Sequence, residues 1–378
     1  MAPHNDAPSP SGSYTAGFNR MPYRPVVTSS LMTGRLDSME PHSPLSSSYS
    51  TTSEASDFHM ARPLVPGVYV PTVCFFEEGT EDVDTDTIAR HAVRLARAGV
   101  TGLATQGSNG EAVHLTHAER QLVTATTRKA LNESGFSQMP IIVGCGAQST
   151  REAIQLCREA WEAGGDYALV LPPSYYASLF APASETILSY FTAVADASPI
   201  PLIIYNFPGA VGGMDLSSDI IVQLAQHPNI VGVKLTCGNT GKLQRVAAAT
   251  RKMAGARHDP ARPEFLVLAG SADFTVQSLV AGGHGILAGL ANIAPRACIR
   301  TMELFNQGKT ADAQAMQEVV AAGDWTAIQG GVVGVKSGLQ GWMGYGGNAR
   351  SPLPKPNGEQ ARKWKDGFRE LVLLEKSL

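Results

Sequence analysis

The sequence of 378 residues lacks the features that define several protein classes. Its five cysteines are scattered and none belongs to a C-x-x-C pair, which argues against a structural zinc site and a disulfide framework and fits a reducing compartment. No run of about 18 apolar residues exists, so we expect no membrane-spanning helix. The net charge of -3 gives no strong field for nucleic acid or an anionic membrane. We expect no metal, because metal-ligand spacing is missing at His91, His114, His117, His227 and His284.

The first 62 residues differ in composition from the rest of the chain. They are rich in Ser, Pro and Thr and show no apolar periodicity, so we predict a disordered tail over residues 1–62. The tail has no long apolar segment of the kind found in secretory signals. Arg20, Arg24 and Arg35 stand against one early acid, Asp6, which weakly resembles a mitochondrial presequence, but prolines are frequent. We therefore expect a cytoplasmic protein, with a mitochondrial location as the alternative.

The whole sequence is 43% hydrophobic, and beyond the tail short β-branched runs alternate with longer helical patterns. The predicted strands are 68–74, 100–105, 140–144, 167–171, 201–205, the run that ends at Lys234, 265–269 and 285–288. The predicted helices are 84–98, 117–131, 150–163, 184–195, 217–226, 242–253, 274–281 and 295–306. Strict alternation implies parallel strands joined by helical crossovers.

Eight such units predict an α/β fold of the (β/α)8 TIM barrel type, which we place at residues 63–308. An open, doubly wound sheet is the alternative, but residues 71–75 do not form the phosphate loop that would follow its first strand. After Gly308 only helical patterns follow, at 311–321, 329–343 and 359–374. We therefore predict a C-terminal helical extension over residues 309–378.

Lys234 ends the sixth predicted strand, directly after the apolar residues 230–233. Lysine is rarely buried, and burial disfavours its charged form, so a buried lysine can act as a neutral nucleophile. A Schiff base with a carbonyl substrate requires such an amine. The ordinary alternative is a lysine that reaches solvent or forms an ion pair at the end of its strand.

Catalytic groups of a barrel lie at the carboxyl ends of its strands, so the other strand ends are candidate site positions. Tyr205 ends the fifth strand and could transfer a proton, or it could simply close the barrel core. Ser108 and Asn109 stand between two glycines and could bind a carboxylate, although an ordinary turn is equally compatible. Tyr176 could line a pocket, meet a neighbouring subunit or pack on the surface. The remaining candidates in these loops and strands are Gly107, Gly270 and Leu287.

Together these residues resemble the dihydrodipicolinate synthase / N-acetylneuraminate lyase family over about residues 66–354. Four motifs carry the resemblance in the family's order, namely Gly-Ser-Asn-Gly-Glu at 107–111, Pro-Ser-Tyr-Tyr at 173–176, Ile-Tyr-Asn-Phe-Pro at 204–208 and Gly-Val-Lys-Leu-Thr at 232–236. The resemblance implies a barrel enzyme, usually a homotetramer built as a dimer of dimers, that holds pyruvate or another 2-oxo acid as an imine. It implies Lys234 as the imine lysine, Tyr205 as the proton-transfer group, Ser108 and Asn109 on the carboxylate, and Tyr176 as a hydroxyl relay in a neighbouring subunit's site.

One departure bears on the reaction. The synthases of this family carry an arginine shortly after the Tyr-Asn-x-Pro motif, which binds the second substrate's carboxylate, whereas residues 209–213 are Gly-Ala-Val-Gly-Gly here. The chain is thus similar to the eukaryotic branch of 4-hydroxy-2-oxoglutarate aldolases and fungal 2-keto-3-deoxy-L-galactonate aldolases. The segment 341–347 points the same way.

The resemblance predicts a class I aldolase, a carbon–carbon lyase that cleaves a 2-oxo-3-deoxy or 4-hydroxy-2-oxo acid to pyruvate and an aldehyde. The lysine imine would serve as the electron sink, so we expect neither a metal nor another cofactor, and a small-molecule 2-oxo acid as the partner. A synthase-like condensation or a dehydration on the same imine is one alternative. A barrel that only binds a 2-oxo acid is another, although binding alone requires neither Lys234 nor Tyr205.

Overall fold

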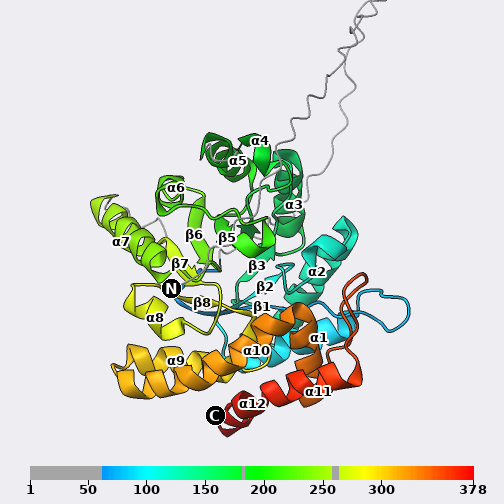
Figure 1. Cartoon of the computed structure of the whole chain (residues 1–378). Helices are drawn as coiled ribbons and strands as arrows, with labels where there is room; N and C mark the ends of the chain where they lie inside the picture. Colours follow the sequence, from blue (N-terminus) through cyan, green and yellow to red (C-terminus); the bar gives the residue numbers. More distant parts are fainter. Residues whose placement is uncertain (1–61, 181–183, 258–263) are drawn as a thin grey trace, which may run out of the picture. The chain divides into compact units, whose positions relative to one another are not determined.

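The computed structural model describes residues 62–180, 184–257 and 264–378, so the predicted disordered tail lies outside the described residues except for Arg62. Eight parallel strands close into a barrel in sequence order, because the first strand also pairs with the eighth. Figure 1 shows these strands at the centre of a ring of helices. The strands are β1 Gly67–Pro71, β2 Gly102–Thr105, β3 Ile141–Gly144, β4 Tyr167–Val170, β5 Leu202–Asn206, β6 Ile230–Leu235, β7 Leu266–Ala269 and β8 Gly285–Leu287. The predicted barrel is confirmed, and the open doubly wound sheet is excluded.

The helices of the barrel follow the predicted positions closely. They are α1 Thr85–Arg97, α2 His117–Glu133, α3 Thr150–Glu162, α5 Ser184–Ala197, α6 Ser218–Leu224, α7 Thr240–Arg257, α8 Thr275–Val280 and α9 Pro295–Asn306. A capping box begins α2, because the Thr116 hydroxyl accepts from the Glu119 amide and the Glu119 carboxylate accepts from the Thr116 amide. A short helix that the sequence did not reveal, α4 Ala177–Phe180, follows β4.

Apolar side chains fill two regions on either side of the strands. Inside the barrel lies a compact cluster that includes Tyr69, Ala104, Ile142, Leu169, Ile203, Leu266, Leu268 and Leu287. Outside it, the other faces of the same strands and the surrounding helices share a second apolar cluster, whose members include Val70, Leu103 and, from α1, Leu95. Because side chains alternate between the two faces of a strand, both faces of every strand are buried. That explains the nearly continuous apolar runs in the sequence.

The C-terminal helices differ in detail from the prediction. Two helices are expected at 311–321 and 329–343, and α10 Thr310–Met343 does consist of two helices, but they meet at a kink at Gly331 (φ 54°, ψ -152°) rather than between residues 321 and 329. A positive φ of this kind suits glycine, which has no Cβ to clash with the backbone. The helix predicted at 359–374 is instead two helices, α11 Gly358–Gly367 and α12 Arg369–Ser377, which meet at the fully buried Phe368.

The predicted boundary between barrel and extension falls between α9 and α10, and whether the two form separate domains stays a prediction. Residues of α10 nevertheless line the cavity at the carboxyl ends of the barrel strands, so the extension contributes to the candidate site. In the described part of the chain, no helix is both long and apolar enough to cross a membrane.

Candidate active site

Lys234 lies in β6 with only 4% of its surface exposed. In the sheet it is the direct neighbour of Tyr205 on β5, and its amino nitrogen lies 4.2 Å from the centre of the Tyr205 ring. Among the described residues, no carboxylate lies within ion-pair distance of this nitrogen. The ordinary alternatives, an ion-paired lysine or one that extends into solvent, therefore do not describe Lys234.

A cavity of about 490 Å³ opens above Lys234 at the carboxyl ends of the strands. Its lining combines strand ends, the loops after them and one face of α10. Predicted site residues in this lining are Ser108, Asn109, Tyr205, Lys234 and Gly270. Further lining residues are Pro71, Phe207, Thr236, Cys237, Gly238, Ser271, Asp273, Phe274, Gly289, Asp324, Ala327, Ile328, Gly331 and Val335. Volume and position are those expected of a small-molecule site in a barrel.

The loop after β2 brings two polar side chains to this cavity. The Ser108 hydroxyl lies 3.4 Å from the Tyr205 hydroxyl, so a proton can pass between them with a small approach. The Asn109 amide lies directly against Gly289, where even a Cβ atom would come within 2.3 Å of its nitrogen. Glycine at position 289 therefore leaves room for the Asn109 amide to face the cavity.

The same loop is anchored behind the cavity by Glu111, whose backbone is left-handed (φ 52°). One carboxylate oxygen accepts from Lys336 at 3.1 Å, and the other accepts from the Arg350 amide at 2.9 Å and lies 3.1 Å from His114 Nδ1. Both partners of the Glu111–Lys336 ion pair are buried. Burial lowers the pKa of Lys336, and the nearby Glu111 opposes that shift. Lys336 does not line the cavity, so its role in the structure is to hold the loop.

Two carboxylates at the cavity, Asp273 and Asp324, were not proposed as site residues from the sequence. One oxygen of Asp324 accepts hydrogen bonds from the Ser271 hydroxyl (2.7 Å) and from the amides of Ala272 (2.6 Å) and Asp273 (3.0 Å). Burial raises the pKa of Asp324 to about 6, and the neighbouring charge of Asp273 adds to the rise. Gly270, in the loop after β7, is a candidate from the sequence. Nothing in the sequence around Asp324, however, indicates that this residue of α10 holds that loop in place.

Two buried polar atoms in the cavity wall have no hydrogen-bond partner among the described residues, Thr236 Oγ1 and Asp273 Oδ1. Unpaired buried polar atoms are costly, and a ligand with hydroxyl groups could satisfy them. Gly270 lies beside the first of these atoms, because a Cβ at that position would come within 1.9 Å of Thr236 Oγ1. A glycine at position 270 therefore allows β6 and β7 to pack closely at the cavity wall.

Three predicted residues are not brought to this cavity. Leu287 is fully buried inside the barrel, and the wall near β8 is formed by Gly289 instead. Gly107 is buried and does not line the cavity. Tyr176 is 62% exposed and packs edge-on against Tyr175, with ring centres 4.9 Å apart, away from the cavity of its own chain. Within the described ranges, no group of three or more His, Cys, Asp or Glu residues is arranged to hold a metal.

Comparison with known proteins agrees with this geometry. Residues 65–370 match the model of the Dihydrodipicolinate synthetase family. The "Probable 4-hydroxy-2-oxoglutarate aldolase, mitochondrial" of Emericella nidulans is 56% identical over 84% of this chain and 98% of its own length. The "L-threo-3-deoxy-hexylosonate aldolase" of Aspergillus niger is 47% identical over 84% and 98% of the two chains. A crystal structure of a dihydrodipicolinate synthase family protein from Coccidioides immitis superposes with a TM-score of 0.71 at 33% identity, over 84% of this chain and 99% of that one. The chain belongs to the dihydrodipicolinate synthetase family.

Proposed function

We propose that the protein is a class I aldolase that cleaves a 2-oxo acid to pyruvate and an aldehyde through an imine on Lys234. The observation that carries the proposal is the buried amino group of Lys234, which has no carboxylate partner among the described residues and lies beside Tyr205 under the cavity. Two relatives at 56% and 47% identity carry aldolase names, which supports the same class of carbon–carbon lyase.

The reaction begins when the Lys234 amine attacks C2 of the substrate. The carbinolamine loses water to give an iminium, with Tyr205 passing the protons. Tyr205 then takes the proton of the C4 hydroxyl, directly or through water, while the C3–C4 electron pair moves into the iminium and the aldehyde leaves. Protonation of the enamine at C3 and hydrolysis release pyruvate and restore Lys234. The iminium is the electron sink, so this route needs no metal and no other cofactor.

The substrate's carboxylate is assigned to the loop after β2. Ser108 and Asn109 reach the cavity there, and the Ser108 hydroxyl also lies next to that of Tyr205. Holding the carboxylate fixes the direction in which C2 faces Lys234, which is the positioning contribution to the rate. With pyruvate's half of the substrate placed there, the aldehyde half extends toward the loop after β7 and toward α10.

That second half of the cavity favours an uncharged, hydroxyl-bearing aldehyde. Its polar groups include Ser271, Asp273 and Asp324, and Lys234 is the only lysine or arginine among the described lining residues. A second substrate carboxylate would meet like charges there, whereas hydroxyl groups could donate to the carboxylates and pair with the two buried polar atoms that have no partner. We therefore infer a 2-keto-3-deoxy-L-galactonate type of substrate. The name of the relative with 56% identity supports 4-hydroxy-2-oxoglutarate as the second candidate.

Pyruvate release from both substrates tests the proposal, with coupling to lactate dehydrogenase as the readout. We expect release from both to be lost in K234A, and a higher kcat/KM for the 3-deoxy sugar acid in the wild type. D273N removes one of the two carboxylates, so it should reduce the difference in kcat/KM between the 3-deoxy sugar acid and 4-hydroxy-2-oxoglutarate. Release by K234A would overturn the mechanism. A wild-type preference for 4-hydroxy-2-oxoglutarate, unchanged in D273N, would overturn only the choice of substrate.

We further propose a homo-oligomer, the dimer of dimers usual in this family. Three large side chains near the start of α4 are strongly exposed, Tyr175 (78%), Tyr176 (62%) and Leu179 (80%), which supports an interface on this face. Tyr176 would then complete a neighbouring subunit's site. Analytical ultracentrifugation of the wild type and of Y175S/L179S tests the interface, and unchanged mass in the variant would contradict it.

A mitochondrial location is the last part of the proposal. The word "mitochondrial" in the name of the relative with 56% identity supports the alternative rather than the cytoplasmic location that we expected first, for which the comparisons offer no support. The arginines near the start of the chain agree with a presequence, although they lie outside the described residues. Fractionation of cells that express the full chain and a variant lacking residues 1–59 tests it. Identical distribution of the two forms would contradict it.

A further inference from the structure

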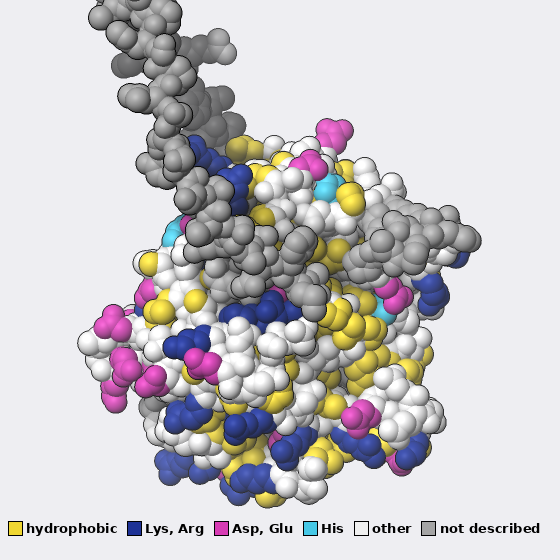
Figure 2. Space-filling model, turned by 180° about the vertical axis from the view of Figure 1, so that it is seen from behind, with side chains coloured by type: hydrophobic (Ala, Val, Ile, Leu, Met, Phe, Trp, Pro, Cys, Tyr) yellow, Lys and Arg dark blue, Asp and Glu magenta, His cyan; other side chains and the backbone are white. Residues whose placement is uncertain are grey.

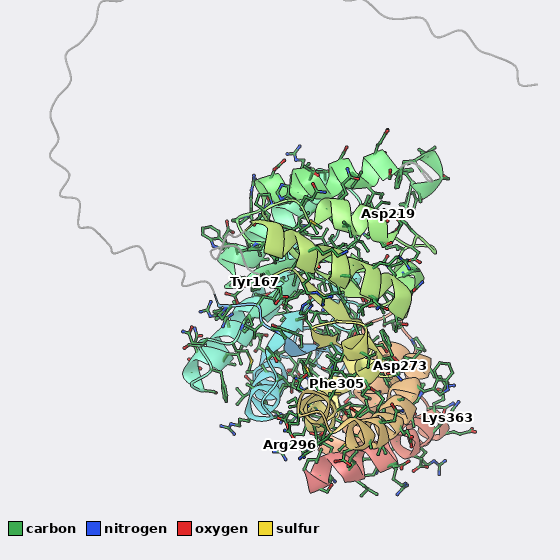
Figure 3. All side chains as sticks on the ribbon, turned by 90° about the vertical axis from the view of Figure 1, so that its left-hand side faces the viewer. Tyr167, Asp219, Asp273, Arg296, Phe305 and Lys363 are labelled. Atoms are coloured by element: carbon green, nitrogen blue, oxygen red, sulfur yellow. The ribbon has the colours of Figure 1, made fainter. Side chains whose placement is uncertain are left out.

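A second cavity, of about 820 Å³, lies on the outside of the barrel. It is bordered by α1, the end of α2, the start of α9, the end of α10 and α12. Figure 1 shows α1, α9, α10 and α12 gathered in the lower part of the molecule, and Figure 3 shows Arg296 of α9 well apart from Asp273 of the first cavity. The charged lining residues are Arg90, Arg94, Arg97, Arg296, Lys376, Glu133 and Glu375.

The positive charges of this lining are concentrated on α1. Arg90, Arg94 and Arg97 are spaced i, i+4 and i+7, so they share one face of the helix. Like charges at these spacings repel one another and destabilise a helix. Seen from behind, lysine and arginine side chains also outnumber acidic ones over the lower part of the molecule (Figure 2). An anion bound on this face would relieve the repulsion.

The two carboxylates of the lining are engaged elsewhere. Glu375 accepts hydrogen bonds from the amides of Arg296 (3.1 Å) and Ala297 (2.8 Å), so it caps the start of α9. Glu133 lies 3.9 Å from Lys129, one turn before it on α2. Neither carboxylate forms an ion pair with an arginine of the cavity among the described residues. The lining therefore carries five cationic side chains and two carboxylates, and each carboxylate already has another partner.

One arginine of the cavity is held in place, and two of the exposed ones have no partner among the described residues. Arg94 donates from Nε to the Tyr345 hydroxyl at 2.7 Å and from another nitrogen to the Asn292 carbonyl. Arg97 and Arg296 are exposed, and their side chains have no hydrogen-bond or ion-pair partner among the described residues. A fixed guanidinium flanked by available ones is suited to charge-assisted, bidentate bonds with carboxylate or phosphate oxygens.

We propose that this cavity is a regulatory site for a small organic or inorganic polyanion that carries two or more carboxylate or phosphate groups. The volume accommodates a molecule of metabolite size, and the excess of cations in the lining suits a multivalent anion rather than a monovalent one. The site is distinct from the cavity at Lys234, because the two share no lining residue. Binding to it does not rest on the aldolase function proposed above.

A hydrogen-bond chain leads from this cavity to the first one. The Tyr345 hydroxyl lies 2.9 Å from His91 Nδ1, and His91 Nε2 lies 3.0 Å from the Asn292 side-chain oxygen. Burial and the charge of Arg94 lower the pKa of His91 to about 3, so the ring is neutral. A neutral imidazole has one nitrogen that donates a hydrogen bond and one that accepts. Tyr345 therefore accepts from Arg94 and donates to His91, which donates to Asn292.

Asn292 ends the chain at the substrate cavity. Its side-chain nitrogen donates to the carbonyls of Pro71 (2.9 Å) and Gly289 (2.8 Å), and both residues line the cavity at Lys234. Gly289 is also the residue against which the Asn109 amide packs. An anion that shifts Arg94 thus acts on the backbone that shapes the 2-oxo acid site, so the bound anion changes the affinity of that site.

Calorimetric titration of the full chain with citrate and with pyrophosphate tests binding, and the two probes separate carboxylate from phosphate recognition. We expect at least one probe to bind the wild type and to bind R97A/R296A at least about tenfold more weakly, because two charge-assisted contacts are removed. The matched control is R151A/R158A, two exposed arginines of α3 that lie outside the cavity. Its affinity should equal that of the wild type. No binding of either probe, or an equal loss in both variants, would overturn the site.

The regulatory effect has its own measurement, which rests on the imine chemistry proposed above. The pyruvate concentration that gives half-maximal borohydride trapping should change at least about twofold when the bound probe saturates the wild type. H91F breaks the chain at a residue that lines neither cavity, so it should keep probe binding but reduce this change. An unchanged trapping midpoint in the wild type would overturn regulation, and a change retained in full in H91F would overturn the route through His91.

Discussion

The amino nitrogen of Lys234 lies 4.2 Å from the centre of the Tyr205 ring, and the two residues are register partners on neighbouring strands of the barrel. Parallel pairing fixes their relative position through the backbone rather than through flexible loops. A nucleophile and its proton-transfer group built on adjacent strands are therefore positioned before the substrate arrives. The Ser108 hydroxyl, 3.4 Å from that of Tyr205, extends the arrangement toward the cavity.

Borohydride reduction in the presence of pyruvate should convert the imine to a carboxyethyl amine on Lys234 alone. The buried amine faces the cavity, whereas the ammonium of Lys336 is tied to Glu111 and lies outside the lining. Intact mass and peptide mapping identify the modified residue, and the Lys336 peptide of the same digest is the internal control. K234A should give no adduct. An adduct on Lys336 would show that the wrong lysine has been placed at the centre of the mechanism.

Y205F should lower kcat by about 10²- to 10⁴-fold, the usual contribution of a general acid–base group, and leave KM within about threefold. The phenol ring stays, so its stacking on Phe207 and its contact with Lys234 are preserved and only the hydroxyl is lost. Steady-state pyruvate release measures both constants. S108A, which removes the hydroxyl next to Tyr205, serves as the comparison and should affect kcat less. Equal rates for Y205F and the wild type would remove Tyr205 from the proton-transfer role.

Most of the barrel could be predicted from the sequence because its signals are local. Each strand of a buried parallel sheet is an apolar run, and several helices begin at a capping side chain such as that of Thr116. The break in α10 is predicted at the wrong position because a non-local effect decides it. Ala322 to Ile328 contains weak helix formers, yet the helix continues there because packing on the barrel outweighs propensity, and it is interrupted only at Gly331.

The site was predictable only where it coincides with a strand end. Lys234, Tyr205 and the loop of Ser108 follow from that rule, and the structure brings them to one cavity. Asp324 could not be found in this way, because it approaches from a helix after the barrel and its hydrogen bonds to the loop after β7 are long-range contacts. Leu287 shows that not every residue at a strand end belongs to the site, since its side chain packs inside the barrel and does not line the cavity.

E111Q should lower the free energy of unfolding by about 3–5 kcal/mol, because it leaves the buried Lys336 charge without its partner. Both side chains are almost completely inaccessible to solvent, so solvent does not screen the unpaired charge and does not reduce the loss of stability. The double variant E111Q/K336M should recover most of the stability, since an unbranched apolar side chain replaces the unpaired ammonium. Urea denaturation measures all three proteins. A double variant no more stable than E111Q would show that the pair's charge is not the cause.

The last prediction concerns Asp324 and the dependence of stability on pH. In the folded protein burial raises the pKa of Asp324 from its ordinary 3.8 to about 6, so the folded state binds this proton more tightly than the unfolded state does. The resulting stabilisation is complete below about pH 4 and is lost as pH rises through about 6. One pKa unit corresponds to about 1.4 kcal/mol, which makes the loss about 3 kcal/mol.

D324N isolates this contribution. A single oxygen of Asp324 accepts all three hydrogen bonds from the loop after β7, and the asparagine carbonyl can take its place without titrating. The free energy of unfolding of the wild type minus that of D324N should therefore fall by about 3 kcal/mol between pH 4 and pH 7. Urea denaturation at several pH values in this range measures the difference, in which the other titrating groups cancel. A difference that stays constant or rises with pH would show that Asp324 does not titrate in this way.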